Sequence, residues 1–184
     1  MAKIRGRRIY HTVRKYMPDL IYGANDGLVT TFAIVSGVVG ARLPALVVVI
    51  LGFANVIADG FSMGASNFLA LRSRIEDGEQ RLPTGAALRH GLATFTSFVL
   101  LGSLPLLAYV VPMPGGWRFP LAAALTLAIL FSVGAARSAV SELRWLRSGL
   151  EMLFVGAVAA GVAYGLGALI SGLTSGSGGL AGAG

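Results

Sequence analysis

The sequence of 184 residues contains no cysteine, which excludes disulfide frameworks, cysteine zinc sites, iron–sulfur clusters and thiol catalysis. Charged residues are also scarce: they make up 12% of the chain, against roughly 25% in a typical soluble domain. Hydrophobic residues make up 55%, and the mean hydropathy is +0.75. A chain with so little charge cannot cover a water-facing surface, so the composition predicts a membrane protein.

Five apolar stretches are long enough to cross a hydrocarbon core about 30 Å thick, which takes roughly 20 helical residues. The predicted spans are residues 20–41, 43–71, 90–112, 119–140 and 150–173. Their apolar runs are continuous rather than alternating, which favours helices over a transmembrane barrel. The sequence therefore predicts an all-α membrane protein: a basic arm at 1–18, one five-helix domain at 19–174 and a flexible Ser/Gly-rich tail at 175–184.

Basic residues are distributed very unevenly among the predicted loops. Thirteen of the fifteen lie in the N-terminal arm, in the segment 72–89 and in the segment 137–147, whereas Arg42 and Arg118 stand alone in the other two loops. This pattern predicts a cytoplasmic N-terminus. Attraction to anionic lipid explains the arm without any nucleic-acid partner. The excess of Arg over Lys, together with abundant Ala and Gly, indicates a bacterial plasma membrane.

Two carboxylates lie within the predicted spans, Asp26 and Asp59. Insertion of each costs about 2.5–3.5 kcal/mol, so each needs an explanation. Asp19 precedes Asp26 by seven residues and therefore shares its helix face. That face continues with small or polar residues: Gly23, Thr30, Ala33, Gly37 and Gly40. A face of this kind lets another helix approach closely, so we expect it to contact protein rather than lipid.

The second predicted span places Asp59, Met63 and Asn67 one turn apart on a single face. If the two spans face each other, they align a row of candidate metal ligands: Asp19, Asp26, Asp59, Met63 and Asn67. Oxygen ligands suit Mn²⁺ or Fe²⁺, and the thioether disfavours hard ions such as Mg²⁺ and Ca²⁺. Protons compete with a metal ion for the same carboxylates, so Asp26 and Asp59 are also the candidate proton-coupling residues.

Structural interpretations of these residues remain open at this point. A transmembrane Asp can pair with an Arg or cap a backbone, Met63 can fill a gap in the packing, and Asn67 can join two helices. His11 and His90 are interpreted as solvated residues at the membrane surface, and Glu151 as a carboxylate at a helix start. The sequence has no hydrolase-type spacing of Ser, His and Asp, and we expect no enzymatic activity.

The residues around these carboxylates resemble a known family. The string Asp19-Leu-Ile-Tyr-Gly-Ala-Asn-Asp-Gly-Leu-Val-Thr-Thr resembles the first helix of the vacuolar iron transporter family, and Ala58-Asp-Gly-Phe-Ser-Met-Gly-Ala-Ser-Asn67 resembles its second. The resemblance implies a proton-coupled exporter of Fe²⁺, often also Mn²⁺, from the cytosol. It implies a homodimer whose ion path runs between the subunits and is lined by Asp19, Asp26, Asp59 and Met63. The metal is then cargo, and no cofactor is expected.

Two departures from the family pattern stand out. Family members commonly carry a Glu-rich cytoplasmic metal-binding domain after the second helix, whereas only residues 71–90 connect the second and third spans here. The family's second helix often continues with a Gly-Glu-Tyr type motif, whereas this chain reads Ala65-Ser-Asn-Phe. Two alternatives are therefore kept: a non-transporting dimeric assembly or regulatory protein whose buried Asp residues are structural, and a transporter of another substrate.

Overall fold

The computed structural model describes the backbone of residues 2–80, 82–83, 85–139 and 144–178, and the side chains from Arg14 to Ser175 within these ranges. The helices are α1 (Ala2–Gly40), α2 (Ala45–Glu76), α3 (Gly85–Gly102), α4 (Leu104–Val110), α5 (Gly115–Arg137) and α6 (Trp145–Gly178). These ranges contain no strand. The prediction of an all-α fold is confirmed.

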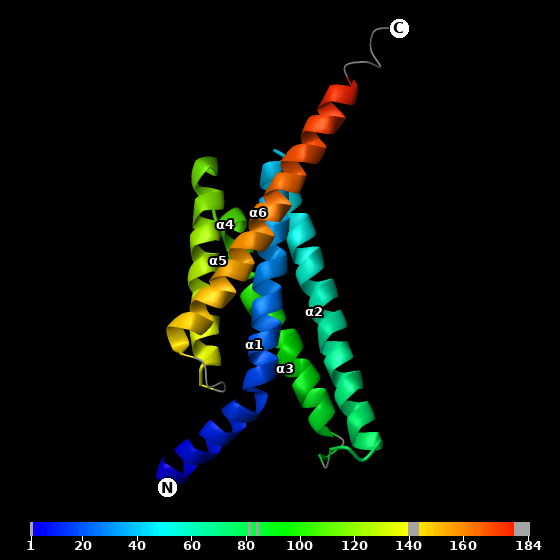
Figure 1. Ribbon diagram of the computed structural model, residues 1–184, viewed down its shortest axis with the longest axis vertical. Helices are drawn as coiled ribbons and strands as arrows, with labels where there is room; N and C mark the ends of the chain where they lie inside the picture. Colours follow the sequence, from blue (N-terminus) through cyan, green and yellow to red (C-terminus); the bar gives the residue numbers. More distant parts are fainter. Residues whose placement is uncertain (1, 81, 84, 140–143, 179–184) are drawn as a thin grey trace.

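Four helical segments of the described chain are long and apolar enough to cross a membrane. They are Ala45–Glu76, Gly85–Val110, Gly115–Arg137 and Trp145–Ser175. The fifth predicted span lies in α1, which is not among the four; Asn25 and Asp26 make it more polar. In Figure 1, α1 nevertheless runs through the middle of the bundle, and it packs most extensively against α3 and α6. Four apolar spans confirm a multi-pass membrane protein.

Both ends of the chain are more helical than the sequence predicts. The basic segment 1–18 was expected to be an arm separate from the first span, but α1 begins at Ala2 and continues into that span. Pro18 lies inside α1, where a missing N–H and a steric clash bend a helix, and Figure 1 shows the bend. Residues 175–178 of the predicted tail belong to α6; residues 179–184 lie outside the described ranges.

The predicted span 90–112 consists of two helices. α3 ends at Gly102, and α4 begins at Leu104 with Pro105 in its first turn. Proline cannot donate the hydrogen bond that would continue α3. The backbone N–H and the Oγ of Ser103 both donate to the carbonyl of Val99, at 3.1 and 2.6 Å. The expected kink at Pro105 is therefore a change of helix.

Helix α3 packs backbone to backbone against both α1 and α2. A methyl group added at Gly27 would come within 2.6 Å of the Phe98 carbonyl oxygen. One added at Gly64 would come within 2.8 Å of the Gly91 carbonyl oxygen. Contacts this close require glycine, as is usual where helices associate in lipid. The small residues of α1 and α2 thus fix α3 against both helices.

The glycines of α6 do not all act as packing residues, although the sequence predicts that they do. A methyl group at Gly167 would collide with the Gly37 carbonyl oxygen of α1, and one at Gly156 would collide with the Leu130 side chain. Around Gly161 and Gly165, by contrast, no described atom lies within 4 Å. α6 therefore packs through Gly149, Gly156 and Gly167, whereas Gly161 and Gly165 lie on a free surface of the described chain.

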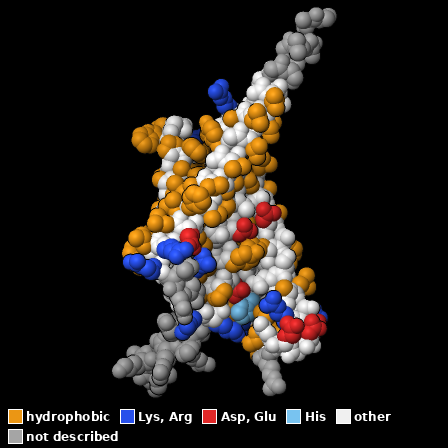
Figure 2. Space-filling model, in the orientation of Figure 1, with side chains coloured by type: hydrophobic (Ala, Val, Ile, Leu, Met, Phe, Trp, Pro, Cys, Tyr) orange, Lys and Arg blue, Asp and Glu red, His pale blue; other side chains and the backbone are white. Residues whose placement is uncertain are grey.

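The three basic segments lie at the same end of the bundle. Figure 1 shows the N-terminus, the α2–α3 connection and the α5–α6 connection at one end, and the α1–α2 turn with the C-terminus at the other. Most Lys and Arg side chains in Figure 2 gather at the first end, below a broad apolar band. This arrangement agrees with the charge pattern from which a cytoplasmic first end is predicted.

Candidate functional site

Asp19 lies at the basic end of the bundle, where α1, α2 and α3 meet. Asn67 Nδ2 donates to its Oδ1 at 2.8 Å. His90 Nδ1 lies 2.5 Å from its Oδ2. The side chains of Asp19 and His90 are only 15% and 12% exposed. Both carboxylate oxygens of Asp19 are therefore occupied by protein donors, one from α2 and one from α3.

Further hydrogen bonds extend this group, which we call the Asp19 cluster: Asp19, Asn67, His90 and Thr94. Asn67 Nδ2 also donates to Thr94 Oγ1 at 2.7 Å, and Thr94 Oγ1 donates to the His90 carbonyl at 3.2 Å. Of the five predicted ligands, Asp19 and Asn67 are thus in direct contact. The cluster joins three helices, one of which the predicted ion path did not include.

The interpretation of His90 as a solvated residue is wrong. Its side chain is largely buried, and its ring centroid lies 4.6 Å from that of Tyr16. Its Nε2 atom is buried and has no hydrogen-bond partner within the described part of the chain. The available signal was the spacing of His90 and Thr94, two polar residues one turn apart on an otherwise apolar helix. The other histidine, His11, has no described side chain.

Asp26 and Asp59 lie near each other about two helical turns further into the bundle. Their negative charges are close enough to repel. Asp26 is half-buried, whereas Asp59 is exposed on the surface of the single chain. Figure 2 shows acidic side chains midway along an otherwise apolar face. No described side chain forms a hydrogen bond or an ion pair with either carboxylate, so neither is paired with an arginine of the described part of the chain.

Met63 completes the row on α2. It is half-buried and lies one turn from both Asp59 and Asn67. The predicted ligands therefore form two pairs, Asp19 with Asn67 and Asp26 with Asp59. Met63 lies between Asp59 and Asn67 along α2. No three His, Asp or Glu side chains among the described residues converge closely enough to hold a metal ion.

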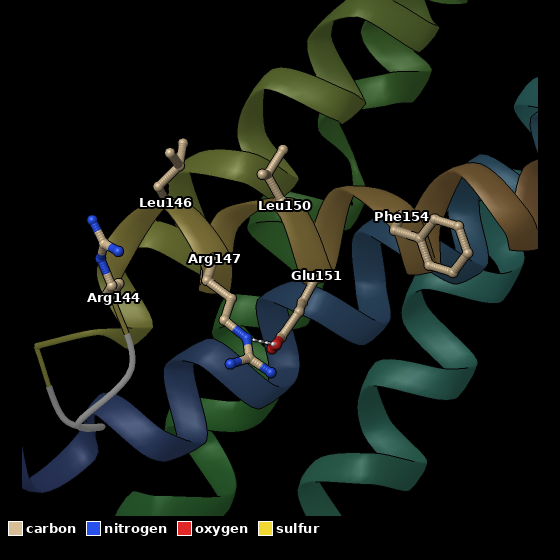
Figure 3. A pocket seen from close by; sticks show the side chains of 6 residues that line it. All are labelled: Arg144, Leu146, Arg147, Leu150, Glu151 and Phe154. Carbon is tan, nitrogen blue, oxygen red and sulfur yellow. Dashed lines mark hydrogen bonds and ion pairs between the residues drawn. The ribbon is translucent and has the colours of Figure 1, made fainter.

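A groove of about 570 Å³ lies elsewhere, along the first turns of α6. Figure 3 shows its lining: Arg144, Leu146, Arg147, Leu150, Glu151 and Phe154. Arg147 Nε donates to Glu151 Oε1 at 3.1 Å, one turn away on an exposed surface. Arginines beside apolar side chains are typical of a helix start at lipid headgroup level. The groove contains none of the candidate ligands. Glu151, which was expected to lie at a helix start, lies beyond the first turn of α6, because that helix begins at Trp145.

Comparison with known proteins finds a family match over the part of the chain that carries the candidate ligands. The profile of the VIT family matches residues 17–83 and 75–168, a range that contains every candidate ligand. The chain belongs to the VIT family. The resemblance seen in the sequence is therefore confirmed, and the Asp19 cluster lies within VIT-family sequence on all three of its helices.

Two relatives match the VIT-family chain along most of their length. Vacuolar iron transporter homolog 3 of Arabidopsis thaliana is 27% identical, covering 88% of this chain and 86% of the relative. Vacuolar iron transporter 1 of the same plant is 23% identical, covering 84% and 86%. The vacuolar iron transporter of Plasmodium berghei is 38% identical over a shorter stretch. That match covers 36% of this chain and a quarter of the length of the relative, 25%.

Proposed function

We propose that this protein exports a divalent transition metal ion, Fe²⁺ or Mn²⁺, from the cytosol in exchange for protons. The observation that carries the proposal is the pair of Asp26 and Asp59, two carboxylates within electrostatic reach of each other that form no hydrogen bond or ion pair with any described side chain. Buried carboxylates at this depth are costly and usually functional. The names of the curated relatives support iron as the cargo.

The exposed position of Asp59 supports a homodimer. In a single chain this carboxylate would face lipid, where an unpaired charge is strongly unfavourable. A symmetric partner would cover it and add a second Asp26, Asp59 and Met63. Two incomplete ligand sets would then form one complete set. The resemblance to the family implies the same interface.

Repulsion between Asp26 and Asp59 provides a physical basis for exchange. Two negative charges in a medium of low dielectric are stabilised when a divalent cation or a proton binds between them. The metal ion and the proton therefore compete for the same oxygens, and release of one favours binding of the other. Met63 supplies a polarisable sulfur, which favours a transition metal over Mg²⁺ or Ca²⁺. The ion enters at the Asp19 end and leaves toward the α1–α2 turn.

The membrane that holds the protein is part of the proposal. The composition, rich in Arg, Ala and Gly, supports a bacterial plasma membrane, with the basic end in the cytosol. Export across that membrane would move the ion out of the cell.

Transport by the purified protein tests the proposal directly. Proteoliposomes are loaded with a dye that Fe²⁺ and Mn²⁺ quench, with the interior more acidic than the medium, and metal is added outside. We expect quenching that depends on the pH gradient and is lost in Asp26→Asn and Asp59→Asn. Asp77→Asn, which alters an exposed carboxylate at the end of α2, is the matched control and should transport normally. Absence of flux, or flux unchanged by Asp26→Asn, contradicts the proposal.

The alternative of a non-transporting assembly protein predicts a different result. If Asp26 and Asp59 only hold subunits together, their Asn variants lower dimer stability, and metal ions have no effect on either form. Size-exclusion chromatography of both variants, with and without Mn²⁺, separates the two cases. A panel of divalent ions in the flux assay also tests for another substrate.

A further inference from the structure

We propose that His90 and Asn67 hold Asp19 in a side-chain clasp that closes the basic end of the ion path. This proposal rests on the proposed function, because it concerns how the ion enters the proposed ion path. It assigns His90 as a positioning residue that acts through Asp19 and not as a ligand of the ion.

The occupancy of Asp19 is the first argument. A carboxylate has two oxygens, and here Asn67 Nδ2 lies at 2.8 Å from one and His90 Nδ1 at 2.5 Å from the other. Because an ionised carboxylate only accepts, both neighbours must donate to it. A metal ion that approaches Asp19 therefore competes with these two neighbours for the carboxylate oxygens. In the closed arrangement both Asn67 and His90 contact the carboxylate of Asp19.

The rigidity of the surrounding backbone is the second argument. Gly91, next to His90, lies against Gly64 of α2, where even a methyl group would come within 2.6 Å of the Gly64 carbonyl oxygen. Ser97 Oγ also donates to the Leu20 carbonyl at 2.5 Å and ties α3 to α1. Helices fixed in this way cannot easily separate at the clasp. The side chains are the movable part, and entry needs rotation of His90 rather than movement of a helix.

The position of the clasp is the third argument. Asp19 and His90 are each slightly exposed and lie at the basic end of the bundle, so a rotated His90 can reach water. Met63 lies one turn before Asn67 on α2, further from the basic end of the bundle, and is half-buried. An open clasp should therefore increase access from the basic end to position 63. This effect can be measured without transport.

The natural absence of cysteine allows a sharp test. Met63→Cys is introduced alone, with His90→Leu and with His90→Gln, into the full chain in membrane vesicles with the basic end outward. The rate of reaction with a cationic, membrane-impermeant thiol reagent is measured. We expect His90→Leu, which removes the donor, to increase the rate at position 63 at least tenfold. His90→Gln keeps an amide donor and should react at nearly the original rate.

Ser73→Cys is the matched control, since it lies exposed at the same end but outside the cluster. Its rate should be the same in all three backgrounds. The proposal is overturned if His90→Leu leaves the rate at position 63 unchanged, if His90→Gln increases it equally, or if position 73 accelerates as well. The last result would indicate a loosened fold instead of an open clasp.

The labelling result separates the clasp from the proposed function. Wild-type protein without metal flux but with the expected labelling pattern contradicts the transporter and leaves the clasp in place. Flux that Asp26→Asn abolishes, combined with labelling that His90→Leu does not change, supports the transporter and overturns the clasp.

Discussion

Asn67 donates a hydrogen bond of 2.8 Å to Asp19, within the segment where the resemblance to the family implied a Gly-Glu-Tyr type motif and this chain reads Ala65-Ser-Asn-Phe. An ionised glutamate could not donate, and it would place a second negative charge beside Asp19. The amide instead donates to both Asp19 and Thr94. The departure at Asn67 therefore has a structural reason: the chain uses this position to hold Asp19.

Asn67→Asp should make the cluster dependent on metal. The new carboxylate faces Asp19 and removes a donor, which we expect to cost about 1–3 kcal/mol of stability without metal. A divalent ion can bridge the two carboxylates and restore the lost stability. Thermal unfolding in detergent, with and without Mn²⁺, measures both effects. Ser66→Asp adds the same charge at an exposed neighbouring position and should show neither effect.

Asp26→Asn and Asp59→Asn should each abolish stabilisation by metal. A ligand at a hundred times its Kd stabilises the folded state by about 2.7 kcal/mol. For a chain of this size that corresponds to an increase in Tm of roughly 5–10 °C. We expect wild type and Asp77→Asn to show the increase with Fe²⁺ or Mn²⁺, and both Asn variants to lose most of it. An equal increase in Tm in all four proteins would show that the metal ion binds at a site other than Asp26 and Asp59.

Gly27→Ala should destabilise the protein, whereas Gly161→Ala should not. The added methyl group at position 27 comes within 2.6 Å of the Phe98 carbonyl and forces α1 and α3 apart. Overpacking of this kind typically costs about 1–3 kcal/mol. No described atom lies within 4 Å of the same position at Gly161. Unfolding followed by intrinsic tryptophan fluorescence compares the two, and equal stabilities would refute the packing argument.

The orientation can be tested with single cysteines at opposite ends of the bundle. Ser73 lies at the basic end of α2 and Gly115 at the start of α5, both exposed. An impermeant thiol reagent added to intact cells should modify Gly115→Cys at once. It should modify Ser73→Cys only after permeabilisation, because the positive-inside pattern predicts a cytoplasmic basic end. The reverse pattern would invert the direction of the proposed transport.

The sequence predicted the apolar spans that contain α2, α5 and α6, but it treated α3 and α4 as one continuous span. Residues seven apart on the first span and four apart on the second placed Asp19 and Asn67 in one row of candidate ligands, and the structure joins these two by a hydrogen bond. His90 was missed because its neighbours Asp19 and Asn67 come from other helices, and one sequence does not specify how α3 packs between them. The sequence predicted only part of the break at Ser103. Pro105 indicated a bend, but not that a new helix, α4, begins at Leu104.

The outward position of Asp59 on α2 also bears on how the protein is made. If the protein forms the proposed homodimer, a newly inserted single copy would hold this charged group against acyl chains until a second copy arrived. Assembly would then be the last step of folding, and subunits without a partner would be exposed to membrane proteases. The cellular amount of the protein should consequently fall more steeply than gene dosage when synthesis is reduced.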